Sequence, residues 1–300
     1  MDRQAKHRGI VATGYFMGLL AGAAYGTNPL FAKPLLDDGV SVLTMLFFRY
    51  FISALLIGGW MLLRKHSLKV SLREFGWLSL LGFLFATSSM ALFASYCYIP
   101  SGFATTLIYL YPVMVAMLMA LQGVYPSKRT WLSIVVTFVG VVLMCNPSES
   151  VEFQPVGILL AVVSALSYAG YFVIVNSVKS IRRVSPSTIT CYSLISGSAL
   201  FFLCILVLGV DVEAGLRWPD SCLRFLGLAL IPTVVSILAL TIATRLIGAT
   251  KTSVLGVTEP LTSIFIGVFL FGEAMTAAGM LGVALCLSAI LFLIVSPKEK

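Results

Sequence analysis

The feature that most constrains the fold is a series of long apolar runs that follow one another along nearly the whole chain. A helix needs about 20 apolar residues to cross the ~30 Å hydrocarbon core of a bilayer. Ten such runs are present, near residues 9–32, 41–63, 75–97, 103–121, 130–146, 155–176, 186–209, 222–244, 250–271 and 276–295. Because the connections are short, the sequence predicts an all-α integral membrane protein with ten transmembrane helices and no soluble domain.

Composition agrees with a membrane environment, because only 11% of the residues are charged, whereas soluble domains have about 25%. Arg3, Lys6 and Arg8 precede the first run as they would in a signal peptide. That run is too long for a signal peptide, so we expect a retained first helix. The six cysteines form no CxxC pair, and we interpret them as packing residues. Neither a metal site nor a cofactor is expected.

Basic residues are concentrated in alternate connections between the runs. Sixteen of the twenty lie in one set, namely Arg3, Lys6, Arg8, Arg64, Lys65, Lys69, Arg73, Lys128, Arg129, Lys179, Arg182, Arg183, Arg245, Lys251, Lys298 and Lys300. The opposite set holds most of the acidic residues together with Lys33, Arg217 and Arg224. Since cytoplasmic loops are rich in Lys and Arg, we expect both termini to be cytoplasmic. The net charge of +8 then reflects topology and does not indicate nucleic-acid binding.

Two weak internal alignments predict a repeat. A shift of 148 residues places Pro112 on Pro260. A shift of 143 residues places Gly18, Gly22, Tyr25 and Gly26 on Ala161, Ala165, Tyr168 and Ala169. The chain thus divides into two five-helix repeats, residues 1–146 and 147–300. Because five is odd, the repeats enter the membrane in opposite senses, which is the structural basis of alternating access.

A stripe of small residues marks the first run, where glycine recurs every fourth residue at Gly14, Gly18, Gly22 and Gly26. Such stripes let helix backbones approach closely in a membrane. Two interpretations remain open, a fixed seam between helices and a surface that slides during transport.

These features resemble the EamA family of the drug/metabolite transporter superfamily, over essentially the full chain. The resemblance rests on the five-plus-five arrangement and on Tyr25-Gly26, Lys33, Phe48-Arg49, Glu259-Pro260 and Gly272-Glu273 in that order. It implies a bacterial inner-membrane carrier that exports amino acids or other small metabolites through a central cavity between the repeats. Val124-Tyr125 stands where the family often has a Gly-Glu pair. We therefore expect Glu273 to be a structural or interfacial residue.

Glu259 is a carboxylate inside a predicted membrane span, roughly 12 Å from the cytoplasmic end of that span. An unpaired charge there costs on the order of 3 kcal/mol, so a partner is expected. Arg49 lies roughly 12 Å in from the opposite face, close enough in depth for the two to meet. Two interpretations stay open: an ion pair that joins two helices, and groups that face the cavity and bind substrate or a proton.

Proton coupling is expected if Glu259 faces the cavity, because desolvation favours its neutral form and a nearby arginine favours its charged form. Pro260 and its repeat mate Pro112 each remove a helix hydrogen bond. We expect both helices to kink there, which would free the carbonyl oxygens of Gly256 and Ile108 as ligands.

Further candidates for the cavity wall are polar residues at membrane depth. Asn28 beside Pro29 should face the bundle interior or water. Tyrosines supply an amphipathic lining, and single hydroxyls either bond to their own helix or face the cavity. The candidates are Asn28, Tyr25, Tyr109, Tyr111, Tyr168, Tyr171, Ser89 and Ser236.

Other function classes are less well supported by the sequence. His7 and His66 lie outside the spans and no HExxH motif is present, which disfavours an intramembrane enzyme. A channel would need a continuous polar stripe along its pore, and the sequence shows none. A sensor would need a soluble output domain, and the sequence shows none of these either. Without a GxxxxGK[ST] motif, the prediction is a secondary-active carrier. Its partners are a small solute, the bilayer and protons, with no nucleic acid; the sequence sets no oligomeric state, and a monomer is allowed.

Overall fold

The computed structural model describes residues 2–66, 68–95, 97–99, 104, 107–144, 154–270 and 276–295. Throughout these ranges the regular elements are helices, and none of the described residues forms a strand. The first half contains α1 (Asp2–Tyr25), α2 (Asn28–Asp37), α3 (Val42–Leu63), α4 (Leu72–Ser95), α6 (Tyr111–Leu121) and α7 (Lys128–Met144).

The second half begins with α8 (Pro155–Ser177), the short α9 (Lys179–Arg183) and α10 (Pro186–Leu208). It continues with α11 (Asp220–Ala229), the π-helical segment η1 (Leu230–Val235) and α12 (Ser236–Ile247), which follow one another without a gap. The chain then forms α13 (Ala249–Leu255), α14 (Thr258–Leu270) and α15 (Ala277–Val295).

Eight helical stretches within the described ranges are long and apolar enough to cross a membrane. They are Gly9–Asp37, Val42–Leu63, Leu72–Ser95, Pro155–Ser177, Pro186–Leu208, Asp220–Ile247, Ala249–Leu270 and Ala277–Ile294. The spans expected at 103–121 and 130–146 correspond to the shorter helices α6 and α7, and each expected span includes residues outside the described ranges. The fold is a multi-pass helical bundle, while the count of ten crossings stays a prediction.

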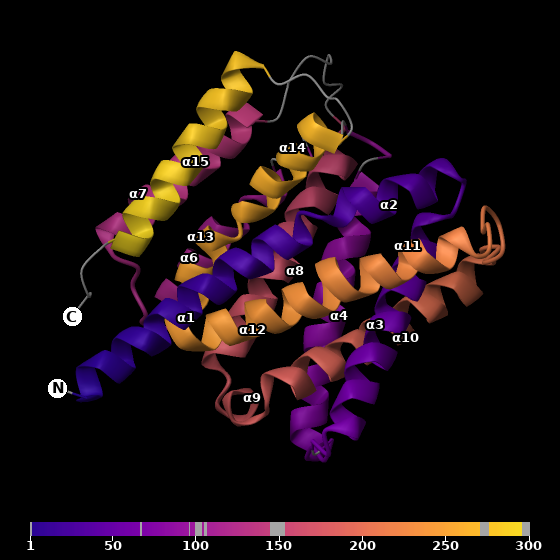
Figure 1. Ribbon diagram of the computed structural model, residues 1–300, viewed down its shortest axis with the longest axis horizontal. Helices are drawn as coiled ribbons and strands as arrows, with labels where there is room; N and C mark the ends of the chain where they lie inside the picture. The colour runs from indigo at the N-terminus through magenta and orange to yellow at the C-terminus, as the bar shows by residue number, and fades with distance from the viewer. Residues whose placement is uncertain are drawn as a thin grey trace.

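Helices of the two halves pack against each other rather than forming separate bundles. The most extensive contacts join α7 with α15, α1 with α12, α4 with α8 and α3 with α10, and Figure 1 shows α7 and α15 running side by side. In order along the chain, α1, α3, α4 and α7 of the first half match α8, α10, α12 and α15 of the second half. Under this matching the α1–α12 contact is equivalent to the α8–α4 contact. The α3–α10 and α7–α15 contacts each join a helix to its own equivalent. The contact pattern is therefore that of two related halves facing each other.

Equivalent hydroxyl residues begin the second long helix of each half. The Ser41 hydroxyl accepts a hydrogen bond from the Thr44 backbone N–H at 3.1 Å, and α3 follows. The Ser185 hydroxyl accepts from the Thr188 N–H at 3.1 Å, and α10 follows. Both serines satisfy a backbone donor that the first helical turn leaves unpaired. The two halves thus share this local structure although few residues are identical.

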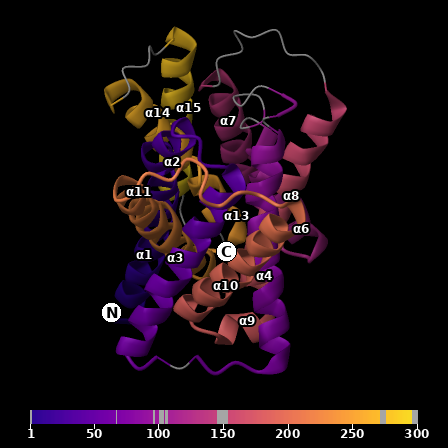
Figure 2. The same ribbon diagram turned by 90° about the vertical axis from the view of Figure 1, so that its right-hand side faces the viewer.

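Charged residues join α2 to the start of α11 at one end of the bundle. Asp38, directly after α2, forms ion pairs with Arg217 at 3.1 Å and with Arg224. The Arg224 guanidinium also donates to the Pro34 carbonyl at 3.2 Å. The start of α1 and the end of α15 both lie on the left in Figure 1. This ion-paired connection lies on the right, and Figure 2 shows the same bundle from that side.

Candidate functional site

The glycine stripe of α1 packs directly on the helices that carry Glu259. A Cβ atom added at Gly18 would lie within 3.0 Å of Leu255, and one at Gly26 would lie within 3.0 Å of the Glu259 carbonyl oxygen. Hydroxyl groups of α14 extend this seam, because Thr258 donates to the Leu19 carbonyl at 3.0 Å and Ser263 to the Gly26 carbonyl at 3.0 Å. A side chain at Gly26 would push the first turn of α14 away from α1.

Glu259 lies in the first turn of α14, directly after a break in the helix. α13 ends at Leu255 and α14 begins at Thr258, so Pro260 occupies a first-turn position where its missing N–H leaves no bond unmade. The prediction of a free Gly256 carbonyl is wrong, because this oxygen accepts the Glu259 N–H at 2.9 Å. The break instead turns the Glu259 side chain inward, where Tyr109 hydrogen-bonds to it.

Pro112 plays the matching role in the first half, where it lies in the first turn of α6. The chain turns at Tyr109 and Leu110, and α6 begins at Tyr111. Thus a helix starts at each proline, and neither helix bends around one. The Tyr111 hydroxyl donates to the Ser253 carbonyl at 2.9 Å, which ties α6 to α13 and holds the two breaks side by side.

A small cavity of ≈ 30 Å³ lies where these breaks meet. That volume accommodates one or two water molecules. Its lining comes from both halves and consists of Tyr25, Phe85, Ser88, Ser89, Leu92, Ile108, Tyr109, Tyr111, Tyr168 and Glu259. Six of these are sequence candidates, namely Tyr25, Ser89, Tyr109, Tyr111, Tyr168 and Glu259. The other four are Phe85, Ser88, Leu92 and Ile108. No pattern in the sequence distinguishes an apolar residue on a cavity wall from one in the core.

Arg49 is buried, with 2% of its surface exposed, and lies outside the cavity lining. Its Nε atom donates to the Thr233 hydroxyl at 2.7 Å, and a terminal nitrogen donates to the Pro232 carbonyl at 3.3 Å. Its Cζ atom lies 5.1 Å from the centre of the Tyr25 ring. Arg49 and Glu259 interact electrostatically, but no ion pair joins these two described residues. Of the two interpretations left open by the sequence, the described structure does not show the ion pair between helices, and the Tyr25 ring lies beside the guanidinium.

Arg49 binds the π-helical segment η1, a partner that was not predicted from the sequence. In a π-helix each backbone hydrogen bond spans five residues, where an α-helix spans four. Such segments are frequent at functional sites. Here the widened turn presents the Pro232 carbonyl to Arg49, while Thr233 also donates to the Leu228 carbonyl at 2.8 Å. The available signal was Pro232, a proline in the middle of a predicted span.

Three further candidates lie apart from the cavity wall. The Tyr171 hydroxyl pairs with the Thr241 hydroxyl at 3.1 Å, and Ser236 donates to the Ala21 carbonyl at 2.9 Å. Asn28 begins α2, and its Oδ1 atom is buried without a hydrogen-bond partner in the described structure. Gly272-Glu273 lie outside the described residues. No group of three potential metal ligands occurs in the part of the chain that is described.

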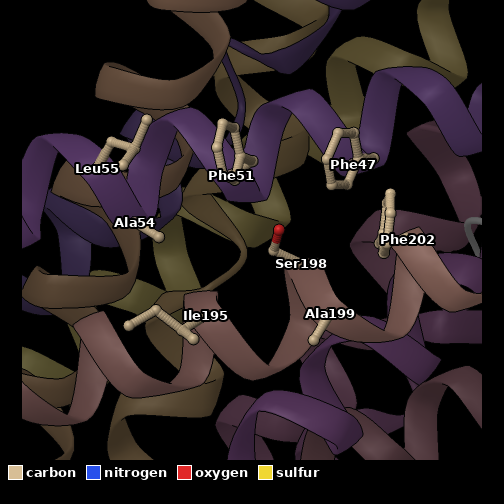
Figure 3. Close-up of a pocket in the computed structure, with 8 residues that line it drawn as sticks. All are labelled: Phe47, Phe51, Ala54, Leu55, Ile195, Ser198, Ala199 and Phe202. Atoms are coloured by element: carbon tan, nitrogen blue, oxygen red, sulfur yellow. The ribbon is translucent and has the colours of Figure 1, made fainter. Parts of the chain in front are cut away.

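A larger hollow of ≈ 420 Å³ lies between α3 and α10. Its lining is Phe47, Phe51, Ala54, Leu55, Ile195, Ser198, Ala199 and Phe202, and Figure 3 shows these side chains on the facing sides of the two helices. Phe51, Leu55 and Phe202 are exposed. We call this hollow the α3–α10 groove. It opens to the apolar outside of the bundle, and the only polar side chain in its lining is Ser198.

A bundle of apolar helices enclosing a polar cavity lined by both halves has the architecture of a membrane transporter. A family model described as the EamA-like transporter family matches residues 12–146 and again residues 155–295. The chain belongs to this family, and the two matches together cover most of it.

Individual relatives agree with this assignment. An uncharacterized transporter of Archaeoglobus fulgidus is 28% identical over 273 residues, covering 91% of this chain and 93% of the relative. An uncharacterized transporter of Synechocystis is 30% identical over 207 residues, covering 68% of this chain and 62% of the relative. One solved crystal structure superposes on this chain with a TM-score of 0.81 at 18% sequence identity. The match covers 94% of this chain and 96% of the chain in that structure, and it supports the fold alone.

Proposed function

We propose that the protein is a secondary-active exporter of amino acids or related small metabolites in the bacterial inner membrane. In this proposal the two repeats are inverted, and cargo crosses by alternating access through the cavity around Glu259. Glu259 binds a proton on the outside and releases it on the inside while cargo moves outward. Both termini are cytoplasmic.

The observation that carries the proposal is the place of Glu259 in a small cavity between two helix breaks. A carboxyl group at membrane depth is a functional candidate by default. Broken helices beside a central cavity are typical of carriers, whose repeats move around the substrate site. A volume of ≈ 30 Å³ is too small for an amino acid, so this conformation corresponds to a closed state from which the halves must separate.

The test replaces Glu259 by Gln, which keeps the shape of the side chain and removes its titration. A growth-inhibition screen in overproducing cells first identifies an exported solute. Purified protein in proteoliposomes is then assayed for uphill, pH-driven accumulation and for counterflow of that solute. We expect Glu259→Gln to abolish pH-driven accumulation while counterflow remains. The matched control is Glu213→Gln, because Glu213 is exposed in the α10–α11 connection.

Either of two results would contradict the proposal. Unchanged pH-driven accumulation by Glu259→Gln would show that Glu259 only packs between helices. Ohmic current without counterflow would indicate a channel.

Orientation is tested by labelling single cysteines with an impermeant maleimide in intact cells, in a background that lacks the native cysteines. The charge distribution predicts that Lys65, Lys128 and Arg183 face the cytoplasm and that Asp38 and Asp220 face outward. We expect labelling at positions 38 and 220 only. Labelling at 65, 128 or 183 contradicts the proposed orientation.

A further inference from the structure

We propose that the cavity recognises its cargo by a positively charged ammonium group, and that a carboxylate on the cargo is dispensable. This inference rests on the proposed transport function and names the chemical class that the same site binds. The cargo is then an amine cation, and an amino acid binds through its amino group. The ammonium group and the proton occupy Glu259 in turn.

The first observation is the aromatic character of the wall. Four tyrosines and one phenylalanine line a cavity of ≈ 30 Å³. Tyr168 lies at the centre of this group, with its ring centre 4.8 Å from that of Tyr111 and 5.8 Å from that of Phe85. Aromatic faces attract cations, and cages of several rings are the usual binding sites for alkylammonium groups. A volume of one or two water molecules accommodates an ammonium head but not a whole solute.

The second observation is the charge within the wall. Glu259 is the only acidic residue among the described residues that line the cavity. It interacts electrostatically with both Tyr111 and Tyr168, so the carboxyl group belongs to the same cage as the rings. A carboxylate beside aromatic faces provides a counter-charge for a cation. It would repel the carboxylate of an acidic solute.

The third observation concerns Arg49, the alternative anchor for a cargo carboxylate. Its guanidinium is bound to Thr233 and Pro232 on η1, and the Tyr25 ring stands next to it at 5.1 Å. Arg49 is not part of the cavity lining. Tyr25 therefore binds one cation within the protein and separates it from the cavity. A cargo carboxylate would have to displace these contacts to reach Arg49.

One carboxyl group can balance one positive charge at a time. If the ammonium group replaces the proton, the net charge of the buried site is unchanged in both forms. The charge of the neighbouring Arg49 guanidinium, which binds only neutral groups among the described residues, is the same in both forms, so the exchange adds no further unpaired charge, which would cost on the order of 3 kcal/mol within a membrane. Binding of the amine must accordingly release a proton, which links the ammonium group to the proton coupling proposed above.

The decisive experiment measures proton release from the purified full-length protein in weakly buffered detergent solution. The hydrochloride of 3-methylbutylamine is the probe at pH 7, where an alkylamine stays protonated, and sodium chloride at the same concentration is the salt control. We expect the wild type and the control Glu213→Gln each to release about one proton per chain. We expect Glu259→Gln to release none. No release from the wild type, or equal release from Glu259→Gln, overturns the inference.

A matched set of solutes tests whether the carboxylate is dispensable. Leucine, its amine counterpart 3-methylbutylamine and its acid counterpart 4-methylpentanoate are compared by thermal stabilisation and by counterflow. We expect the amine to bind at least as tightly as leucine and the acid not to bind. If the acid binds and the amine does not, the inference is wrong, although counterflow of the acid would leave the transport function intact. Failure of all three to bind also overturns the inference.

The cage itself is tested at Tyr168. Replacing Tyr168 by Leu removes an aromatic face, and we expect the affinity for 3-methylbutylamine to fall roughly tenfold. Tyr168→Phe keeps the face and should bind within about threefold of the wild type. Tyr171→Leu is the control, because Tyr171 is a buried tyrosine on the same helix that does not line the cavity. Equal losses for Tyr168→Leu and Tyr171→Leu would show a general packing effect and contradict the cage.

Discussion

The cavity around Glu259 and the α3–α10 groove differ in size, polarity and exposure. The groove has ≈ 420 Å³ and the cavity ≈ 30 Å³, yet the cavity contains the acidic residue, the tyrosines and residues from both halves. The groove walls are apolar apart from Ser198 (Figure 3), and Phe51, Leu55 and Phe202 in them are exposed. In a membrane protein such a hollow is filled by lipid chains as readily as by a ligand. Volume alone therefore does not identify a transport site.

Helix continuity explains the difference. The groove lies between α3 and α10, which run unbroken for 22 and 23 residues and satisfy their backbone hydrogen bonds internally. The cavity lies where α1 gives way to α2, α13 gives way to α14, and α6 begins. The breaks direct Tyr25, Tyr109 and Glu259 inward, as broken helices do beside the cavities of carriers. The unbroken helices α4 and α8 add Ser88, Ser89 and Tyr168 to the same wall. The breaks and these two helices together concentrate polar chemistry at the centre of the bundle.

The largest effect is expected when the contact between the glycine stripe of α1 and the start of α14 is forced apart. Gly26→Leu should destabilise the protein by at least about 3 kcal/mol, the upper end for overpacking. The reason is that its Cβ would lie within 3.0 Å of the backbone of Glu259. Thermal unfolding in detergent and counterflow in proteoliposomes measure the loss. Gly59→Leu in α3 is the control, because a Cβ there meets no atom within 4 Å. Similar melting temperatures for the two variants would show that the seam is not tight.

Local sequence predicted some parts of this site, and other parts depend on contacts between distant helices. Apolar run length predicts a membrane bundle directly, and Glu259-Pro260 stands out as a carboxylate inside a span. Which face of each helix points into the bundle is harder to predict, because helices that are apolar all round carry no amphipathic signal. Tyr168 and Tyr171 were equal candidates, yet only Tyr168 lines the cavity. The η1 segment depends on contacts between α3 and α11–α12, which no local pattern encodes.

An intermediate effect is expected for the contacts of Arg49, and double-mutant cycles measure them. Arg49→Met combined with Thr233→Val should show a coupling of about 1.5–3 kcal/mol, as for hydrogen bonds to charged groups. Arg49→Met combined with Glu259→Gln should show a smaller coupling, because the two groups interact without a direct ion pair. Unfolding in detergent provides the free energies. A larger coupling to Glu259 than to Thr233 would mean that the ion pair forms in the dominant state.

The smallest effect is expected when the groove is filled. Ala199 is exposed on α10 within the groove, so Ala199→Leu adds apolar volume where lipid chains would otherwise pack. We expect unfolding free energy to change by no more than about 0.5 kcal/mol and the transport rate to change less than twofold. Ser89→Leu adds a similar volume to the cavity wall, where the Ser89 hydroxyl pairs with Tyr50 at 3.1 Å. That variant should lose transport, because its side chain fills the ≈ 30 Å³ that the cargo head requires. If Ala199→Leu inhibits counterflow as strongly as Ser89→Leu, the groove belongs to the transport path and the contrast between the two hollows is wrong.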